Sequence, residues 1–394
     1  MRILLLHNYY QQEGGEDTVV ANECELLVSH KNDVKLFSVS NYEIKDFFKK
    51  LKTAWKSPYS TEAKFKIATE IAHYQPDVVH MHNFFPILTP SIYDSCRESN
   101  VPVVQTLHNF RTICPNALLM REGKLCEKCV KSTPYHSVIH GCYRNSRIGT
   151  LALAHMVNYH RSRNTWATKV DRFIALTNFA KNKFIEAGFP EHKITVKPNF
   201  YKEKVKGLAK SPSPRNGALF VGRLSPEKGV PTLLRAWHGL AIPLRIAGAG
   251  PLLSMVQASD NLLVTYTGRL DADVVSIEMG KAAFLVMPSE WYEGFPMVLV
   301  EAFAHGLPVI ASRLGSLAEI VEDGMTGLHF KPGNAENLAA KVRWAVEHPE
   351  EMQRMGENAR REYELKYTGD VNYRQLMEIY EGVVEEKREG GRHA

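Results

Sequence analysis

The sequence contains no run of eighteen apolar residues among its 394 positions. A helix needs about twenty such residues to cross a bilayer, so a membrane-spanning helix is not expected. The first ten residues, MRILLLHNYY, include one Arg and an apolar stretch too short for a secretory signal peptide. They favour a first buried strand instead. We therefore expect a cytoplasmic protein.

Cysteine is also scarce, with six in the chain. In a cytoplasmic protein, cysteines are usually reduced thiols or metal ligands and seldom form disulfides. Internal repeats and low-complexity tracts are absent, whereas the hydrophobic content of 44% and charged content of 23% are typical of soluble globular proteins. The length exceeds that of one ordinary hydrophobic core and predicts two domains.

Positive charge is concentrated in the N-terminal half of the chain. Residues 1–200 carry 26 Lys and Arg against 18 Asp and Glu, while the whole chain has a net charge of +6. The front half is therefore expected to face an anionic partner, or else to be an ordinary solvated surface.

Short apolar runs alternate with helical patterns through both halves of the chain, which predicts an α/β protein with parallel sheets. The expected strands cover 3–7, 77–82, 101–108, 172–177, 193–198, 217–222, 243–248, 262–268, 282–288 and 307–312. The expected helices cover 17–30, 62–74, 90–99, 147–168 and 178–187, and residues 334–388 follow as a helical tail interrupted near His348 and Gly369. Residues 201–216, rich in Lys, Pro and Ser, separate the halves as a linker.

Glycines and cations follow the first expected strand of each half. Gly14 and Gly15 allow a ligand to approach backbone amides ahead of a helix, or form a flexible turn. Their spacing does not match the G-x-G-x-x-G dinucleotide motif. In GRLSPEKG (222–229), Arg223 and Lys228 could neutralise a diphosphate or could be two surface cations.

A third motif, EGFPMVLVEAFAHGLPVIAS (293–312), places two carboxylates eight positions apart. Glu293 lies in the loop after an expected strand, and Glu301 lies in the helix that opens near Pro296. The free amides at that helix start can bind phosphate oxygens or sugar hydroxyls, and Pro296 fits a first helical position. A helix cap and a solvated Glu are the alternative explanation.

Together, the Gly-Gly pair, TLHNFR (106–111), GRLSPEKG, IAGAGP (246–251) and the Glu-x7-Glu motif resemble glycosyltransferase family 4 of the GT-B fold. The resemblance covers nearly the whole chain. It implies two Rossmann-like, doubly wound parallel-sheet domains with a cleft between them. The implied parts are an acceptor-binding domain (1–200), a nucleotide-sugar donor-binding domain (201–366) and a C-terminal helix that crosses back (367–394).

The resemblance also implies a role for individual residues in the donor site. Glu293 would bind the sugar beside the reacting carbon, His108 would hydrogen-bond the sugar, and Arg223 and Lys228 would stabilise the leaving diphosphate. Glu301 would bind the ribose. The remaining donor-binding residues are Gly14, Gly15, Gly222, Gly248, Arg269, Gly294, Phe295, Pro296, Met297 and Val298.

The expected reaction is retaining, metal-independent transfer of a hexosyl or related group from a UDP- or GDP-sugar. The cations and helix amides can stabilise charge on the leaving phosphate, and no cofactor is expected for catalysis. The string TLHNFRTICPNALLMREGKLCEKC (106–129) resembles a bacterial subgroup of the family, most of whose members make cell-surface polysaccharides. The acceptor would be a glycan or a polyprenyl-linked sugar.

Four cysteines, Cys114, Cys126, Cys129 and Cys142, are spaced C-x11-C-x2-C-x12-C. Four thiolates form a closed tetrahedral zinc site, and a zinc ion would order the long polar loop between them. A redox pair at 126 and 129, or four inert thiols, would fit the same spacing. His136, His140 and His155 could each replace one cysteine as a ligand.

Residues 43–56, EIKDFFKKLKTAWK, form a basic amphipathic pattern. Phe47, Phe48, Leu51 and Trp55 recur at spacings of three and four among five lysines. Such a helix suits peripheral contact with the anionic inner face of the cytoplasmic membrane, or packs its aromatic side chains onto the front domain.

Three rival functions remain open. A GT-B nucleotide-sugar epimerase would share the fold without forming a glycoside, and a Rossmann dehydrogenase would bind NAD. A zinc-containing nucleic-acid-binding protein could use the cysteines and the positive charge. The donor motifs in both halves favour transfer and argue against a nucleic-acid partner.

Overall fold

The computed structural model describes residues 1–394 except 12–13, 44–45, 47–52, 204–214 and 391–394. The chain forms two compact units. The first consists of Met1–Leu119, Cys126–Asn199 and Asn372–Ala394, and the second of Met120–Leu125 and Phe200–Val371. The boundaries predicted from the sequence lie at 200/201 and 366/367, and most of the predicted linker falls on 204–214, outside the described residues.

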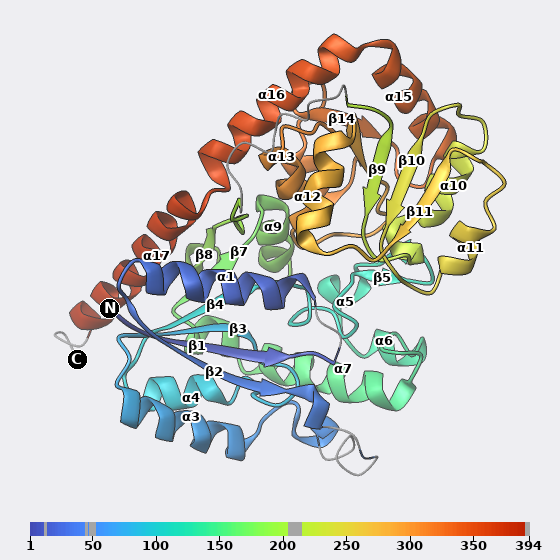
Figure 1. The fold of residues 1–394 in the computed structure, drawn as a ribbon. Helices are drawn as coiled ribbons and strands as arrows, with labels where there is room; N and C mark the ends of the chain where they lie inside the picture. Colours follow the sequence, from blue (N-terminus) through green and yellow to red (C-terminus); the bar gives the residue numbers. More distant parts are fainter. Residues whose placement is uncertain (12–13, 44–45, 47–52, 204–214, 391–394) are drawn as a thin grey trace. The chain divides into compact units, whose positions relative to one another are not determined.

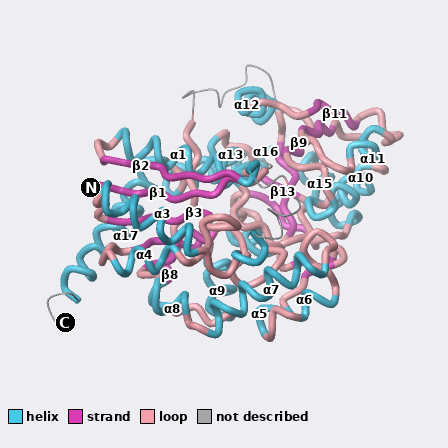
Figure 2. The backbone as a smooth tube through the Cα atoms, turned by 90° about the horizontal axis from the view of Figure 1, so that it is seen from below, coloured by secondary structure: helices cyan, strands magenta, loops and turns pink. Residues whose placement is uncertain are grey.

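The first unit is built on a six-stranded, wholly parallel sheet with the order β2-β1-β3-β4-β7-β8. Figure 2 shows β1, β2 and β3 running side by side. The strand order reverses direction between β1 and β3, and doubly wound sheets bind ligands beyond the strand ends at such a point. The strands are β1 (Arg2–Tyr9), β2 (Asp33–Ser40), β3 (Val78–Asn83), β4 (Val103–Leu107), β7 (Arg172–Ala175) and β8 (Ile194–Val196).

Helices cover this sheet, with α1 on one side in Figure 1 and α3 and α4 on the other. The C-terminal helix α17 packs beside α1, where Leu376 and Tyr380 join the core formed by Ile3, Leu5 and Leu27. The helices of this unit are α1 (Gly15–Ser29), α3 (Thr61–Tyr74), α4 (Ile92–Glu98), α5 (Lys128–Lys131), α6 (His136–Ile139), α7 (Arg147–Ser162), α8 (Thr165–Lys169), α9 (Asn178–Glu186), α17 (Gly369–Gly390), and the 3-10 turns η1 (Asn41–Glu43) and η2 (Glu191–Lys193).

The second unit repeats the architecture with the order β11-β10-β9-β12-β13-β14, again wholly parallel. This is the Rossmann strand order, and its direction reverses between β9 and β12. The strands are β9 (Ala218–Val221), β10 (Leu244–Ala247), β11 (Val264–Gly268), β12 (Phe284–Met287), β13 (Val309–Ser312) and β14 (Gly327–Phe330), and a small antiparallel hairpin pairs β5 (Met120–Arg121) with β6 (Lys124–Leu125).

The second sheet has an apolar core on each face, where its strands pack against helices. Phe220, Ile246 and Val286 pack on one side with Trp237 of α10. Leu219 and Leu285 pack on the other with helices α12 to α14. The helices are α10 (Val230–Trp237), α11 (Leu253–Gln257), α12 (Ala272–Lys281), α13 (Met297–Ala304), α14 (Gly315–Ile320), α15 (Ala335–Glu347), α16 (Pro349–Lys366), and the 3-10 turn η3 (Pro226–Lys228).

The alternating pattern predicted most of these elements, but three predictions were incomplete or wrong. Strands β2 and β14 and the β5–β6 hairpin were missed, since β2 is only half-buried and its apolar residues are interspersed with polar ones. The helix expected at 147–168 is two helices, because Asn164 adopts a left-handed conformation (φ 50°) between them. The strand expected at 172–177 ends at Ala175, and Thr177 caps α9.

Backbone segments approach each other closely at two glycines beside the second sheet. Gly248 has φ +151°, and a Cβ there would lie 1.8 Å from the carbonyl oxygen of Gly222. Gly229 has φ +72°, and its Cβ would lie 1.9 Å from the carbonyl oxygen of Pro288. Any side chain would push these backbones apart, so both positions require glycine for packing.

Gly248→Ala should therefore destabilise the protein by about 3 kcal/mol or more, through the steric overlap and the strained φ together. That corresponds to a fall in melting temperature of roughly 6 °C or more for a unit of this size. Thermal unfolding without ligand measures it. Gly239→Ala is the matched control, because a Cβ at Gly239 meets nothing within 4 Å; equal melting temperatures for the two variants would contradict the packing role.

Candidate functional site

The carboxyl ends of β9 and β12 bring two of the sequence motifs together in the second unit. GRLSPEKG follows β9 and leads through η3 into α10, whereas Glu293 lies in the loop after β12. These strands are neighbours at the point where the strand order reverses. Both loops therefore emerge at the same edge of the sheet, where doubly wound folds place their ligands.

Lys228 and Glu293 form an ion pair at this edge. The Nζ atom of Lys228 donates to Oε1 of Glu293 at 2.7 Å, and Ser289 Oγ donates to the same oxygen at 2.7 Å. Glu293 is only 5% exposed. Oε2 of Glu293 makes no hydrogen bond with a described residue, so one carboxylate oxygen is fixed and the other is available.

Two further predicted cations have no partner within the described part of the chain. Arg223 and Arg269 are both exposed, and neither side chain forms a hydrogen bond or ion pair there. Gly222 precedes Arg223 and provides the carbonyl oxygen that Gly248 approaches. Arg223 thus extends from the same loop as Lys228 with its charge uncompensated.

Helix α13 begins one residue later than expected. Pro296 is its N-cap with ψ 103°, so Met297 and Val298 occupy the first turn. Pro296 was predicted as the first helical residue, but its extended backbone places it outside the helix. The amides of Met297 and Val298 have no acceptor within the helix, which makes this end a suitable place for an anion. Gly294 is held by Ser316, whose Oγ donates to its carbonyl at 3.1 Å.

The side chains around this helix start differ in their surroundings. Phe295 packs against Tyr367, with ring centroids 6.0 Å apart, and joins the apolar core. Glu301 lies on α13, where burial raises the pKa of its carboxyl group to about 7. A ligand that hydrogen-bonds to the carboxylate would stabilise the ionised form of Glu301.

In the first unit, Gly14 caps α1 within a small polar network. Its amide donates to Oδ2 of Asp17 at 2.9 Å, and Oδ1 of Asp17 accepts from Nε2 of His7 at 2.7 Å. A Cβ at Gly14 or Gly15 would meet nothing within 4 Å. The protein's own packing therefore does not demand glycine at these two positions, in contrast with Gly229 and Gly248.

His108 follows β4 and pairs with a histidine of the neighbouring strand β3. Its Nε2 lies 2.9 Å from Nδ1 of His82, and the planes of the two rings make an angle of 20°. Burial, together with the neighbouring His82, holds the pKa of His108 well below its usual range, so the ring is neutral. His108 was predicted from its motif, whereas no role was predicted for His82, although His80 and His82 alternate within a buried strand.

A second missed group surrounds Glu16 on α1. Asn83 donates to one carboxylate oxygen at 3.1 Å and Asn109 to the other at 3.4 Å. Burial and then the nearby Asp17 raise the pKa of Glu16 to about 8. Asn109 belongs to the TLHNFR string, so the motif was seen, but the role of its Asn could not be read from the sequence.

The four clustered cysteines form no disulfide with any described residue. Cys114 and Cys129 are buried, and their sulfurs lie near Asn116 Oδ1 (3.0 Å) and the Pro134 carbonyl (3.7 Å). Burial, then Cys114, Cys142 and Cys126, raise the pKa of the Cys129 thiol to about 12. Within the described ranges, the groups of three ligand atoms that lie within 4.8 Å are Glu23/His80/His82 and His7/Glu16/Asp17, and neither includes a cysteine.

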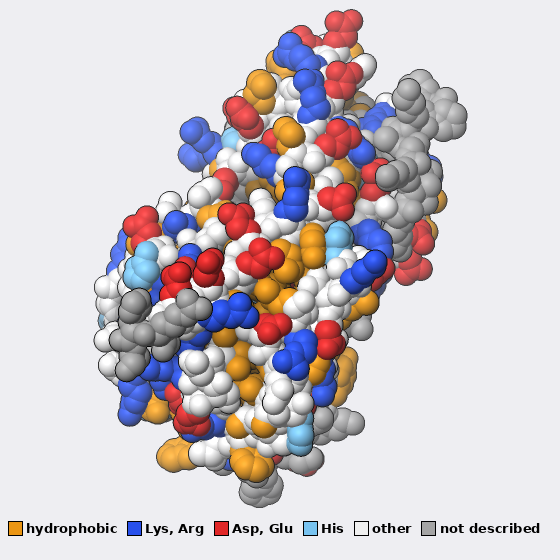
Figure 3. Space-filling model, turned by 90° about the vertical axis from the view of Figure 1, so that its left-hand side faces the viewer, with side chains coloured by type: hydrophobic (Ala, Val, Ile, Leu, Met, Phe, Trp, Pro, Cys, Tyr) orange, Lys and Arg blue, Asp and Glu red, His pale blue; other side chains and the backbone are white. Residues whose placement is uncertain are grey.

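The membrane contact expected at 43–56 falls mainly on residues 44–45 and 47–52, which lie outside the described residues. Trp55, which is described, is 88% exposed. None of the described helices has the length and apolar composition needed to span a membrane. On the face shown in Figure 3, Lys and Arg side chains alternate with Asp and Glu side chains and form no broad patch of one sign.

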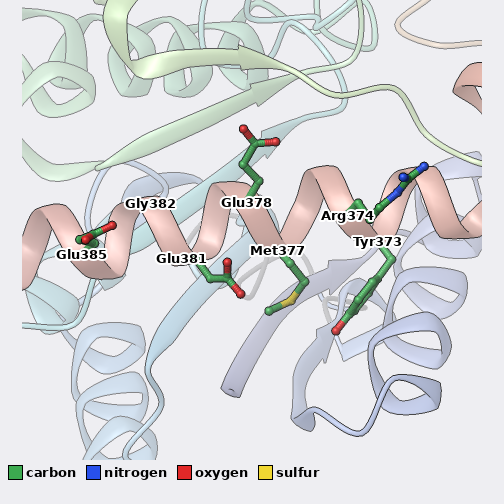
Figure 4. Close-up of a pocket in the computed structure, with 7 residues that line it drawn as sticks. All are labelled: Tyr373, Arg374, Met377, Glu378, Glu381, Gly382 and Glu385. Carbon is green, nitrogen blue, oxygen red and sulfur yellow. The ribbon is translucent and has the colours of Figure 1, made fainter.

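A groove along α17 lies apart from the predicted site residues. It is lined by Tyr373, Arg374, Met377, Glu378, Glu381, Gly382 and Glu385 (Figure 4). Tyr373 and Met377 lie on the same side of α17 in that view, and Tyr373 accepts a hydrogen bond from Asn32 at 3.1 Å. No predicted donor-binding residue lines the groove, which is therefore separate from the candidate site.

Sequence comparison assigns both halves of the chain to glycosyltransferases. The profile of the family "Glycosyltransferase Family 4" matches residues 13–203, and that of "Glycosyl transferases group 1" matches residues 202–362. The two matches meet near the boundary between the two units and together contain the Gly-Gly, TLHNFR, GRLSPEKG and Glu-x7-Glu motifs.

Curated relatives agree with this assignment. An uncharacterized glycosyltransferase of Methanocaldococcus jannaschii, MJ1178, is 28% identical over 323 residues, which cover 75% of this chain and 89% of that protein. The D-rhamnosyltransferase WbpZ of Pseudomonas aeruginosa is 34% identical over 158 residues, which cover 38% of this chain and 41% of WbpZ.

Solved structures show the same fold. Sucrose-phosphate synthase from Thermosynechococcus elongatus superposes with a TM-score of 0.71 at 19% identity, covering 97% of this chain and 98% of that one. HepE (Alr3699) of Anabaena superposes with a TM-score of 0.68 at 18% identity, covering 97% and 100%. With both sheets in doubly wound order and both halves matched, this chain belongs to glycosyltransferase family 4 and has the GT-B fold.

Proposed function

We propose that this glycosyltransferase transfers a hexosyl or related group from a nucleoside-diphosphate sugar to a glycan or lipid-linked acceptor, with retention of configuration at the reacting carbon. The acceptor class we favour is a precursor of cell-surface polysaccharide. The proposal depends most on one observation, which is the paired Lys228 and Glu293 beside the uncompensated Arg223.

This arrangement suits a leaving diphosphate. In the transfer step the bond between the sugar and the phosphate oxygen breaks while a bond from the acceptor oxygen to the same carbon forms. Negative charge grows on the leaving phosphate, which would take the proton of the acceptor hydroxyl. Lys228, positioned by Glu293, and Arg223, which has no partner of its own among the described residues, are the cations that would stabilise that charge. The amides at the start of α13 add partial positive charge, while the free oxygen of Glu293 would accept a hydrogen bond from the sugar.

Glycine in the first unit supports a bound donor as well. Gly14 and Gly15 are not required by packing, so their lack of a side chain is better explained by a ligand that approaches the backbone. One structural neighbour, HepE, has been crystallised with UDP-glucose. A UDP-sugar is therefore the first donor to test, followed by a GDP-sugar, with Glu301 as the residue that would bind the ribose hydroxyls.

We further propose that transfer is metal-independent. The cations Arg223 and Lys228 provide the charge compensation that a divalent ion provides elsewhere. The chain's Asp-x-Asp sequence, Asp271-Ala272-Asp273, lies at the start of α12, where Asp271 is the N-cap and both carboxylates are exposed. Acids at the start of a helix are favoured by the helix dipole, so their presence here does not require a metal ion.

The four cysteines are proposed as a structural zinc site. Cys129 is buried, and the other three thiols lie near enough to act on it electrostatically. Zinc would draw four sulfurs to about 2.3 Å from one ion and lower their pKa values by binding the thiolates. The ion would then fix the loop of residues 115–141 at both ends, through Cys114 and Cys142, and in the middle, through Cys126 and Cys129.

Peripheral contact with an anionic membrane is proposed for the region around Trp55. Trp55 is 88% exposed and Phe65 of α3 is 74% exposed. Both are too large and apolar to be favoured in water, and lysines occur beside them at positions 56, 64 and 66. Exposed aromatic side chains flanked by lysines suit the boundary between lipid headgroups and acyl chains.

Lys228→Met and Glu293→Gln should each lower the rate of sugar transfer by roughly a hundredfold or more, because each removes a group that acts on the developing charge or on the sugar. UDP, GDP and their sugars are first screened for thermal stabilisation of the wild type, since a bound ligand stabilises as RT ln(1 + [L]/Kd). The stabilising sugar nucleotide then serves as donor, and release of nucleoside diphosphate and formation of glycoside are both measured.

Lys281→Met is the matched control, because Lys281 lies in the same unit and is 54% exposed. Full activity in the Lys228 and Glu293 variants, at wild-type melting temperature, would disprove the site. Conversion of the donor into an epimeric sugar nucleotide without any glycoside would favour the epimerase alternative.

Protein purified without added zinc should contain about one zinc per chain, and Cys126→Ser or Cys129→Ser should lose it. Elemental analysis measures the metal, with Cys24→Ser as a control outside the cluster. If the protein contains no metal and all four thiols react with a thiol reagent in the native state, the zinc proposal is wrong. A redox pair or four inert thiols would then remain.

Trp55→Glu should weaken binding to vesicles of phosphatidylcholine and phosphatidylglycerol by roughly tenfold or more, because it replaces a large apolar anchor with a negative charge. Co-sedimentation measures the binding. Leu262→Glu is the matched control, since Leu262 is 98% exposed but lies in the second unit. Equal losses in both variants would show a nonspecific charge effect.

A further inference from the structure

A row of buried polar side chains leads from the interior of the first unit to His108. Lys197 Nζ lies 3.3 Å from Oε2 of Glu23, and Oε1 of Glu23 lies 3.4 Å from Nε2 of His82. His82 Nδ1 in turn lies 2.9 Å from Nε2 of His108. Lys197, Glu23 and His82 are between 1% and 3% exposed, so water cannot satisfy them.

Glu23 is ionised at neutral pH. Burial by itself would favour the neutral acid, but the charge of Lys197 and the two imidazoles of His80 and His82 outweigh it and hold the pKa of Glu23 well below its usual range. Lys197 is itself anchored by Asn372 of α17, whose Oδ1 accepts from Nζ at 3.1 Å. Because Lys197 already supplies the positive charge, Glu23, His80 and His82 do not need a metal ion.

An ionised Glu23 decides where His82 carries its proton. A carboxylate can only accept hydrogen bonds, so an unprotonated Nε2 of His82 would place a lone pair against a negative charge. Neither Nε2 of His82 nor Oε1 of Glu23 forms a hydrogen bond of normal geometry, and both are buried. The attraction of an N–H for the carboxylate across 3.4 Å therefore selects the tautomer with the proton on Nε2.

The tautomer of His82 determines the tautomer of His108. Burial lowers the pKa of His82 to about 4, so its ring is neutral and carries a single proton. With that proton on Nε2, Nδ1 of His82 can only accept, and the hydrogen in the 2.9 Å contact must belong to Nε2 of His108. His108 is also neutral, so its own Nδ1 has no proton. That atom has no hydrogen-bond partner among the described residues.

We propose that Glu23 is a positioning residue that acts through His82 to fix His108 as the Nε2–H tautomer, so that Nδ1 of His108 accepts a hydrogen bond from a sugar hydroxyl. The use of this lone pair in transfer rests on the proposed function. The tautomer itself depends only on Glu23, His82 and His108, and can be read without any substrate.

The second histidine of this group provides a control. His80 Nδ1 lies 2.6 Å from the hydroxyl of Tyr380, and its Nε2 lies 2.8 Å from Thr106 Oγ1. Tyr380→Phe removes one hydrogen bond from His80, whose Nδ1 also lies 3.2 Å from Oε1 of Glu23. The substitution keeps the charge of Glu23 and the contacts from Glu23 to His82 and from His82 to His108. Tyr380→Phe, like a change at Glu23, perturbs the buried interior of the first unit. It is expected to leave the tautomer of His108 unchanged.

The test is ¹⁵N NMR of the full chain labelled at histidine, without nucleotide. A protonated and an unprotonated imidazole nitrogen resonate far apart, and the His108 signals are identified by their absence in His108→Gln. In the wild type we expect an unprotonated Nδ1 and a protonated Nε2. In Glu23→Gln, whose amide can accept or donate, both His108 signals should shift toward the averaged positions of a ring that exchanges between tautomers.

Glu23→Gln leaves Lys197 without a charged partner, so Glu23→Gln/Lys197→Met is measured as well, which removes both charges together. Tyr380→Phe should keep the wild-type His108 signals. A protonated Nδ1 in wild-type His108 would overturn the proposal, as would unchanged His108 signals in either folded Glu23 variant. None of these outcomes depends on transfer activity, so a failure here is distinct from a failure of the proposed function.

Discussion

Every strand in both six-stranded sheets is parallel, and this constraint decides where chemistry can occur. Parallel strands leave all their carboxyl ends at one edge, and the loops that follow them must lie there together. In the second unit, β9 and β12 are neighbours where the strand order reverses, so the loops with Lys228 and Glu293 meet although 65 positions separate the two residues. In the first unit, β3 and β4 bring His82 to His108 in the same way.

Close backbone packing supports this edge in the second unit. The carbonyl oxygens of Gly222 and Pro288 lie where a Cβ of Gly248 and Gly229 would be. These contacts hold the loops after β9 and β10 and the start of α10 in place. The glycines of this unit therefore build the scaffold that presents Arg223 and Lys228, whereas Gly14 and Gly15 of the first unit face open space and are suited to a ligand.

The first unit depends on a buried charge pair rather than on close glycine packing. Lys197 follows β8, Glu23 lies on α1 and Asn372 lies on α17, so one network joins three segments that are far apart in the chain. A buried charge that loses its partner is costly, and this makes the network a constraint on how α17 docks. The same network continues through His82 to His108, so the fold of the unit and the protonation state of His108 share one set of contacts.

The sequence by itself determined the α/β class, most strands and helices, and the family, because hydrophobic periodicity and short motifs are local properties of the chain. It also predicted Lys228, Glu293 and His108 as site residues, because they follow strand ends in recognisable strings. It missed β2, whose half-buried pattern is weak, and it gave no role to Ser289, Glu16, Glu23 or His82. Their roles depend on partners between 4 and 174 positions away. Which residue meets which, and hence which nitrogen of His108 carries a proton, was decided only when the tertiary structure buried these groups together and excluded water from them.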